Sequence, residues 1–487
     1  MGNKKVLLIT PPYHCGVVEV AGTWIPLTLC YLAGAVRKAG YQVEIYDAMS
    51  LHVGFDEIRE KCRQLQPDFV GVTAITATTP DAILTAKTAK EARQDTVTIL
   101  GGVHPTFMDR EVLETSNGAV DWVLRGEAEL TLPKLLDEIC CDGDPFAVPG
   151  TTTVVDGEVK RGLPWTRPDD LDALEPAFDL LDWSIYTYFV EPGSRLGAVS
   201  TSRGCNQACT FCSQQKFTAQ TWRCRDPIEC AKEVAMLHDT YGVDIFLITD
   251  ELPTVEQDRW LTFLEEKQRL APDVKLLMET RASDIVRDKD FLTEYKKAGI
   301  VHIYVGAEAV DQETLNLINK DLSVDDSPHS LKLIRDHGMI TETSFVLGLP
   351  DETPESIAHT LKMSIEFNPD FAHYLAIAPW PYADMYPDLE PHIEEWDYRH
   401  YNLVDPVVKP KNMTRTQVDK AIVDCYRKFY HAKMTEITQR ESDPYRKDYI
   451  LKAMKLIMHS SFITSKMGVL GLVPKAMEAM MKGLNKG

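Results

Sequence analysis

The sequence lacks long apolar runs. Its first hydrophobic stretch covers only residues 6–9 and ends at two prolines, and the longest early uncharged segment, residues 20–36, contains glycine, proline and threonine. A helix that spans a bilayer needs about 20 mainly apolar residues, and a secretory signal needs a longer apolar region than residues 6–9 provide. We therefore expect neither a signal peptide nor an early membrane span, and we predict a cytoplasmic protein.

Positive charge is also scarce. The chain of 487 residues has 52 lysines and arginines against 73 aspartates and glutamates, which gives a net charge of −21. Nucleic-acid backbones bind proteins rich in lysine and arginine, so this balance argues against a nucleic-acid partner. The hydrophobic content of 44% is ordinary for a globular protein, and the length predicts two to four domains.

Two further patterns are missing. The 11 cysteines are an odd count, and a reducing cytoplasm disfavours disulfides, so these residues suit metal binding or catalysis better than a disulfide framework. The first predicted strand is not followed by a GxGxxG motif, so a dinucleotide-binding domain is not expected.

The first 142 residues alternate predicted strands with helices. Five apolar, β-rich runs predict a Rossmann-like (flavodoxin-like) parallel sheet, and such sheets bind ligands beyond the carboxyl ends of their strands. Small or polar residues stand at these ends: Thr10, Pro11, Thr73, Thr76, Gly101, Gly102, Gly126 and Glu127. Glycine and threonine also serve as plain turn residues, so the pattern leaves both a ligand site and simple turns open.

A second series of strands and helices follows a linker. Residues 143–192 are rich in proline and acid and include a candidate hairpin at Asp156–Gly157. Residues 193–385 contain six strand-plus-helix units, which predict a partial (β/α)6 barrel with its chemistry at the strand ends. Residues 386–487 predict a mainly helical C-terminal region. The fold class is therefore α/β with two sheet domains.

Three cysteines directly follow the first predicted barrel strand, at Cys205, Cys209 and Cys212. A structural zinc site needs a fourth ligand, for which Cys224 and Cys230 are candidates, although they lie beyond a polar loop and in a helix-like stretch. Three thiolates can instead bind three irons of a [4Fe–4S] cluster and leave the fourth iron open. An open position suits catalysis, because an amine and a carboxylate can chelate the free iron.

The CxxxCxxC spacing, with Phe211 before the last cysteine, resembles the radical S-adenosylmethionine (SAM) superfamily. The resemblance implies that Asp250 and Glu251 accept the methionine amino group, although "TDELP" departs from the commoner Gly-Gly-Glu form. It also implies that Glu308 binds the ribose hydroxyls. By the same resemblance, the segment around Gly348 lies against adenine, and Arg281 contributes to cofactor binding.

A Rossmann-like domain before such a barrel resembles the cobalamin-binding subclass. The resemblance implies that the strand-end residues of the first sheet lie near the corrin ring. The Asp-x-His-x-x-Gly motif that supplies a cobalt ligand in some cobalamin domains is absent, and His14 and His104 have different surroundings. We therefore expect cobalt without a protein histidine ligand.

Stretches along the whole chain resemble the anaerobic magnesium-protoporphyrin IX monomethyl ester oxidative cyclases. They include residues 19–41, 100–113, 211–217, 280–292 and 426–433. The resemblance implies closure of the isocyclic ring of (bacterio)chlorophyll by a 5′-deoxyadenosyl radical. It also implies a keto oxygen from water, a magnesium-porphyrin substrate, and an electron donor such as a flavodoxin or ferredoxin.

Other functions stay open at this point. One is a cobalamin-dependent radical SAM C-methyltransferase, and another is a non-catalytic tetrapyrrole- or corrinoid-binding protein, against which the intact cysteine set argues. A flat macrocycle needs an aromatic cleft, for which Trp380, Tyr382 and Tyr386 are candidates, although aromatic residues at this spacing also form packed cores.

The C-terminal tail, residues 451–487, has six lysines and one acid, Glu478, in a chain that is acidic overall. Its apolar residues recur near helical spacing, which is typical of a helix on an anionic membrane surface or against the porphyrin cleft. Simple packing on the barrel is the alternative. We therefore predict a cytoplasmic protein with peripheral membrane contact through this tail.

Overall fold

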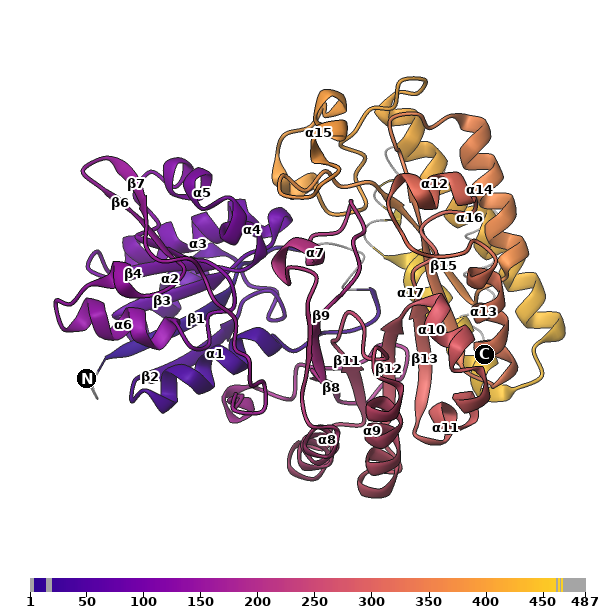
Figure 1. Ribbon diagram of the computed structural model, residues 1–487, viewed down its shortest axis with the longest axis horizontal. Helices are drawn as coiled ribbons and strands as arrows, with labels where there is room; N and C mark the ends of the chain where they lie inside the picture. The colour runs from indigo at the N-terminus through magenta and orange to yellow at the C-terminus, as the bar shows by residue number, and fades with distance from the viewer. Residues whose placement is uncertain (1–3, 15–19, 461–462, 465, 467–487) are drawn as a thin grey trace.

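The computed structural model describes residues 4–14, 20–460, 463, 464 and 466. Figure 1 shows two α/β units, indigo to purple and magenta to orange, with yellow C-terminal helices against the second. The first unit has a seven-stranded sheet in the order β2-β1-β3-β4-β5-β6-β7. Its strands are β1 (Lys5–Thr10), β2 (Gln42–Asp47), β3 (Phe69–Thr73), β4 (Val97–Gly101), β5 (Trp122–Leu124), β6 (Thr151–Val155) and β7 (Glu158–Arg161).

The first five strands are parallel, as the sequence predicted, and both faces of their sheet are covered by helices. In β1, Leu7 and Ile9 enter the core on one face, while Val6 and Leu8 enter the core on the other. Strands buried on both faces read as continuous apolar runs, which explains the sequence of β1. The covering helices are α1 (Leu27–Lys38) and α6 (Leu132–Cys140) on one face, and α2 (Phe55–Leu65), α3 (Thr79–Ala92) and α5 (Asp109–Thr115) on the other.

The hairpin predicted at Asp156–Gly157 is present. Both residues have positive φ, 53° and 80°, which a tight two-residue hairpin requires. Its strands β6 and β7 fall within the predicted linker, and β6 pairs antiparallel with β5. The sheet is therefore wider than the five strands expected. The buried carboxylate of Asp109 on α5 fixes the hairpin by accepting hydrogen bonds from Thr152 (2.8 Å) and Arg161 (2.7 and 2.6 Å).

The second unit has six parallel strands in the order β15-β14-β13-β12-β11-β8, which confirms the predicted partial barrel. Its strands are β8 (Leu196–Val199), β11 (Ile245–Ile248), β12 (Lys275–Thr280), β13 (Ile300–Val305), β14 (Ile340–Leu347) and β15 (Phe371–Ala376). The helices between them are α8 (Pro227–Tyr241), α9 (Gln257–Leu270), α10 (Ala282–Arg287), α11 (Leu292–Lys297), α12 (Gln312–Leu317), α13 (Asp326–Asp336) and α14 (Pro354–Phe367).

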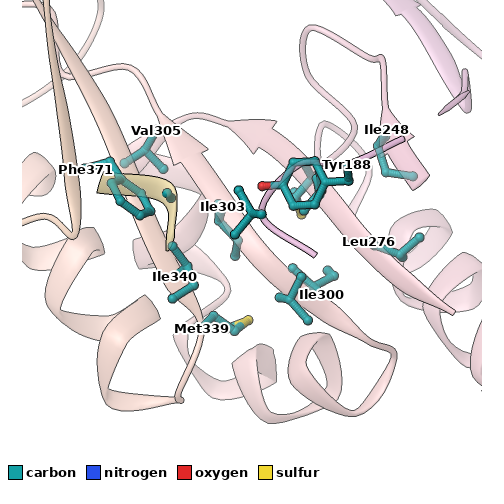
Figure 2. Close-up of a cluster of buried hydrophobic side chains, with 14 of the residues drawn as sticks. Tyr188, Ile248, Leu276, Ile300, Ile303, Val305, Met339, Ile340 and Phe371 are labelled. Atoms are coloured by element: carbon teal, nitrogen blue, oxygen red, sulfur yellow. The ribbon is translucent and has the colours of Figure 1, made fainter. Parts of the chain in front are cut away.

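The main core lies in and around this half-barrel. Figure 2 shows branched side chains of neighbouring strands, among them Ile248, Leu276 and Ile303, with Phe371 and the incoming Tyr188. Fully burying an aliphatic or aromatic side chain of this size contributes roughly 1.5–3 kcal/mol, so the strands are held mainly by this contact.

Two C-terminal helices complete the unit, as the helical prediction for this region indicated. Helix α16 (Arg415–Arg440) packs on β15 and α14, and α17 (Pro444–His459) lies across the amino ends of the barrel strands. Arg446 of α17 bonds to the backbone oxygen of Met339 and, at 2.8 Å, to Asp370, the residues just before β14 and β15. Helix α17 therefore covers the end of the half-barrel at which its strands begin.

This packing changes the interpretation of the first part of the C-terminal tail. Met454 and Ile457 are buried in the main core, so this turn of α17 contacts protein and not a membrane. The remainder of the predicted amphipathic segment, from residue 467 onward, lies outside the described residues. Among the helices that the structure describes, none is both long and apolar enough to cross a bilayer.

Candidate cofactor and active site

The three-cysteine loop leaves the half-barrel between β9 (Ser202–Gly204) and α7 (Gln214–Phe217). Gly204 has a φ of +98°, which turns the chain sharply into the loop. Backbone hydrogen bonds fix the loop from two sides: the Thr210 N–H donates to the Ile318 oxygen (3.0 Å), and the Met385 N–H donates to the Thr210 oxygen (3.0 Å). The cysteines are thus held between the α12 segment and the segment that follows β15.

The three thiols interact with one another and are half-buried. Burial raises the pKa of each, that of Cys212 to about 11, while Lys320 and Arg281 oppose the rise at Cys209. Thiolates in such a place need a positive partner, and iron is one that binds soft sulfur ligands. The donor set therefore fits a [4Fe–4S] cluster with one open iron.

The other candidate ligands lie elsewhere. Cys230 is fully buried in the barrel core, where its electrostatic neighbours are Arg225 and Glu233. Cys224 lies on β10 (Trp222–Cys224) beside Arg259. In the described part of the chain, the charged neighbours of both thiols lie outside the cysteine loop, so the geometry does not support a four-cysteine zinc site.

The structure gives Asp250 and Glu251 different positions. The fully buried carboxylate of Asp250 accepts hydrogen bonds from the Thr201 N–H (2.7 Å), the Thr201 hydroxyl (2.5 Å) and Ser202 (2.6 Å), although burial raises its pKa to about 6. Glu251 lines the cavity described below and accepts from the Gly204 N–H at 3.0 Å. The predicted contact with a methionine amino group therefore suits Glu251. Asp250 instead braces the strand that leads into the cysteine loop.

Glu308 lies where β13 ends, in a left-handed backbone conformation with a φ of 65°. Its carboxylate is 2.8 Å from the Lys320 ammonium and accepts a 3.2 Å hydrogen bond from Ser344. Arg281 stands at the N-terminus of α10 and donates to the Asp321 backbone oxygen, and its charge opposes the rise that burial causes in the pKa of Cys205 and Cys209. Both predicted residues therefore surround the cysteine loop, and their cofactor contacts stay predictions.

Two further predicted residues are Gly348, after β14, and Phe211, within the cysteine loop. Gly348 has a φ of +88° and donates its N–H to Glu352 at 3.1 Å, which shapes the turn after β14. Phe211 packs against an apolar cluster that includes Ile318 and Met385. Trp380 and Tyr386 pack against this same cluster and are not among the residues that line the cavity between the domains.

A cavity of about 560 Å³ lies between the first sheet and the barrel. It brings together residues that the sequence assigned to two different cofactors: Thr10, Thr73, Gly101, Gly102, Gly126 and Glu127 from the first domain, and Glu251 from the barrel. Its other lining is largely apolar and includes Ile25, Leu29, Ile99 and Leu124. Such a mixture is typical of a cofactor pocket with a few orienting polar groups.

Some of the residues predicted to contact cobalamin have structural roles of their own. Gly102 has a φ of +104°, and a Cβ there would lie 2.4 Å from the Ala74 oxygen, so this turn accepts only glycine. The Thr10 hydroxyl is donated to Asp47 at 2.7 Å, and Pro11 is not part of the cavity lining. A Cβ at Gly126 would lie 2.4 Å from the Trp165 ring, so close packing also explains that glycine.

Residues missed by the sequence interpretation join the two domains. Arg203, two residues before Cys205, pairs with Glu127 (2.8 Å) and Glu129 (2.7 Å), and its guanidinium lies 4.9 Å from the Tyr31 ring centroid. Arg223 also pairs with Glu127. A basic residue next to the cysteine motif was a visible signal, but its partners lie more than 70 positions away in the chain.

A second contact joins the domains beside the cysteine loop. The Tyr382 hydroxyl is 3.0 Å from the Thr76 hydroxyl, and its ring stacks on Phe107 with centroids 5.0 Å apart. Thr76 is also 3.2 Å from Nδ1 of the fully buried His104. Thr76 and Tyr382, predicted for the corrin and the porphyrin respectively, therefore meet directly.

The fold and the site define a cobalamin-dependent radical SAM enzyme with a [4Fe–4S] cluster. Residues 13–136 match the B12 binding domain family, and residues 199–364 match the radical SAM superfamily. The fold is similar to the cobalamin-dependent SAM radical enzyme OxsB, with a TM-score of 0.70 and 16% identity over 93% of this chain and 70% of that one. It is also similar to the radical SAM methyltransferase TsrM from Kitasatospora setae, with a TM-score of 0.68 and 17% identity over 88% and 89% of the two chains.

The chain belongs to the anaerobic magnesium-protoporphyrin IX monomethyl ester cyclase family. It is 34% identical to the cyclase of Rubrivivax gelatinosus over 94% of this chain and 83% of that protein. It is 36% identical to the cyclase of Cereibacter sphaeroides over 93% and 75% of the two chains. An uncharacterized methyltransferase of Pyrococcus horikoshii is 29% identical over 88% of this chain and 93% of that protein.

Proposed function

We propose that this protein is a radical SAM oxidative cyclase that forms the isocyclic ring of (bacterio)chlorophyll. Its substrate is magnesium-protoporphyrin IX monomethyl ester, and the new keto oxygen comes from water. The observation that carries the proposal is identity of 34–36% with two such cyclases along nearly the whole chain. The same two domains and the connecting segments are covered, so the likeness is not confined to the shared cofactor-binding parts.

The arrangement of the site supports this chemistry. When bound, the cluster and SAM supply a 5′-deoxyadenosyl radical that abstracts hydrogen from an unactivated carbon, which ordinary acid–base residues cannot do. Cys205, Cys209 and Cys212 hold the cluster, and Glu251 orients SAM. The cavity between the domains supports the proposal, because strand-end residues of the B12-binding domain and Glu251 of the barrel line it together.

An electron donor such as a flavodoxin or ferredoxin completes the proposal, because the cluster must be reduced before each SAM cleavage. A cobalamin-dependent C-methyltransferase is the second candidate, since methyltransferases occur among the relatives. The two candidates differ in their products, because a methyltransferase forms S-adenosylhomocysteine together with 5′-deoxyadenosine.

The deciding experiment is anaerobic incubation of the reconstituted protein with SAM, a chemical reductant and magnesium-protoporphyrin monomethyl ester in H₂¹⁸O. We expect a ring-closed porphyrin that carries one ¹⁸O, with 5′-deoxyadenosine and no S-adenosylhomocysteine. A methylated product with S-adenosylhomocysteine would establish the methyltransferase instead. A ring-closed product without ¹⁸O would contradict water as the oxygen source.

A further inference from the structure

Helix α7, which follows the cysteine loop, forms part of the wall of the cavity between the domains. Figure 1 shows α7 between the two α/β units. Gln214, Phe217 and Thr218 line the cavity together with strand ends of the first sheet. Residues three and four positions apart share one face of a helix, so these three residues present a single face to the cavity.

Other contacts fix α7 in place. The Gln215 side-chain N–H donates to Asp384 at 2.6 Å, and the Lys216 ammonium lies 2.5 Å from the same carboxylate. The Phe217 ring stacks on Trp165, with 6.0 Å between the ring centroids. The helix is therefore held on the barrel by side chains other than that of its first residue.

That first residue, Gln214, connects the cysteine loop with the cavity. Its backbone N–H hydrogen-bonds to the Cys212 sulfur and opposes the rise that burial causes in the pKa of this thiol. Gln214 also lines the cavity, and its half-buried side chain makes no hydrogen bond to any residue that the structure describes. A primary carboxamide offers two N–H donors and an acceptor oxygen, so this side chain can bind a ligand in both senses.

Gln214 differs in this respect from the other polar side chains that the barrel contributes to the cavity. Each of the others has a partner within the protein: Ser200, Ser202, Arg203, Thr218, Thr249 and Glu251. The ligand of this cavity is a corrinoid, and the rim of a corrin ring carries primary carboxamides. Two carboxamides can pair through reciprocal N–H···O hydrogen bonds, so the chemistry of the Gln214 side chain matches that of the rim.

We propose that Gln214 binds the rim of the corrin ring through its carboxamide and thereby couples cobalamin binding to the presence of the iron–sulfur cluster. A cluster held by Cys212 fixes the start of α7, which preorganises the carboxamide and lowers the cost of binding cobalamin. By linkage, bound cobalamin must stabilise the cluster by the same factor. Both groups are cofactors of the matched domain families, so this coupling is independent of the porphyrin substrate.

The test compares Gln214→Leu with the intact protein and with Gln207→Leu. Leucine keeps roughly the size of glutamine and removes its donors and its acceptor. Gln207 is a matched control in the same loop, because its backbone N–H bonds to Cys205 while its side chain donates to Asn206 at 2.7 Å. Gln207 does not belong to the described lining of the cavity.

The first measurement is an absorbance titration with hydroxocobalamin, carried out with the cluster reconstituted and with it removed. With the cluster, Gln214→Leu should bind cobalamin about 3- to 10-fold more weakly than the intact protein, the range expected for a neutral hydrogen bond. The intact protein should bind cobalamin more tightly with the cluster than without it, and Gln214→Leu should lose this difference. Gln207→Leu should behave as the intact protein in both states.

The second measurement is the rate at which an iron chelator removes the cluster. Cobalamin should slow this loss in the intact protein and in Gln207→Leu, and it should have less effect in Gln214→Leu. SAM affinity and the Co(II) electron paramagnetic resonance spectrum should be the same in all three proteins, because a rim contact touches neither SAM nor the cobalt.

Four results would contradict the proposal. Equal cobalamin affinity of Gln214→Leu and the intact protein would exclude the contact. An equal loss of affinity with and without the cluster would exclude the coupling. Weaker SAM binding with unchanged cobalamin binding would assign the carboxamide to SAM. A changed Co(II) spectrum in Gln214→Leu would place the carboxamide at the cobalt instead of the rim.

Discussion

Arg203 and Glu127 form a 2.8 Å ion pair that joins the strand entering the cysteine loop to the carboxyl edge of the first sheet. Glu129 shares the same guanidinium at 2.7 Å. These side chains are largely buried, and the two carboxylates raise the pKa of Arg203 above its ordinary value despite the opposing effect of burial. This guanidinium is therefore one of the groups that join the cobalamin-binding domain to the strand leading into the cysteine loop.

Replacing Arg203 with alanine should destabilise the protein by about 3–5 kcal/mol, since it leaves the buried Glu129 carboxylate without its cation and Glu127 with Arg223 alone. We also expect weaker retention of cobalamin, because the domain edge that lines the cavity loses its attachment. Thermal unfolding and the cobalamin absorbance of the reconstituted protein measure the two effects. As a control, Arg110→Ala breaks an exposed pair with Glu114 and should cost less than about 1 kcal/mol. Equal unfolding temperatures for both variants would contradict this account.

Alanine at Cys205, Cys209 or Cys212 should remove most of the bound iron and abolish SAM cleavage, because three thiolates are the only protein ligands we assign to the cluster. Cys224→Ala should keep both, since that thiol lies apart beside Arg259. Cys141→Ala, an exposed thiol, is a second control. Iron analysis and 5′-deoxyadenosine formation check the prediction, and full iron in Cys209→Ala would refute the cluster assignment.

The cobalt of the bound cofactor should have no histidine ligand from the chain. His14 stacks on His52 at 4.9 Å between ring centroids, and His104 is buried against Thr76 and the rings of Tyr382 and Tyr398. We expect one cobalamin per chain and an unchanged Co(II) electron paramagnetic resonance spectrum in His14→Ala. A nitrogen hyperfine coupling that disappears in that variant would show the opposite.

Acid should destabilise the domain contact through His104. Burial lowers the pKa of this imidazole to about 3, so between about pH 3 and 6.5 the unfolded chain binds a proton that the folded chain does not. Stability therefore rises with pH in this window, and lowering the pH from 7 to 5 should cost about 2 kcal/mol through His104 alone. His104→Gln should flatten this dependence in denaturant titrations. His359→Gln, at an exposed position on α14, should leave it unchanged.

Deleting residues 467–487 should weaken binding to anionic liposomes while leaving the fold intact. Lys466, the last residue that the structure describes, is bound to Asp405 (3.0 Å) and Asp419, so the deletion leaves these contacts in place. The deleted segment contains Lys475, Lys482 and Lys486, which attract anionic head groups. Co-sedimentation with anionic and with neutral liposomes measures the effect. Equal binding by the intact and shortened chains would assign the tail to packing instead.

Several features could be predicted because they depend on residues that are close in the sequence. The alternation of apolar runs and helical stretches predicted both parallel sheets, and the Asp156–Gly157 pair predicted its hairpin. Strands β6 and β7 were not assigned to the first sheet, because an edge pairing between β5 and β6 follows from tertiary packing and not from local pattern. The tail prediction was wrong for Met454 and Ile457, since an apolar stripe faces a core or a lipid equally well.

The sequence by itself determined the chemistry: three cysteines at a fixed spacing after a strand specify the cluster, and a Rossmann-like domain before the barrel specifies the cobalamin site. Only the tertiary structure decided which polar groups are free to contact a cofactor and which are paired within the protein. Asp250 and Glu251 are neighbours in the sequence, yet one is satisfied by Thr201 and Ser202 and the other lines the cavity. Local spacing fixes which atoms can bind a cofactor, whereas the pairing of a charge depends on groups that folding brings from tens or hundreds of positions away.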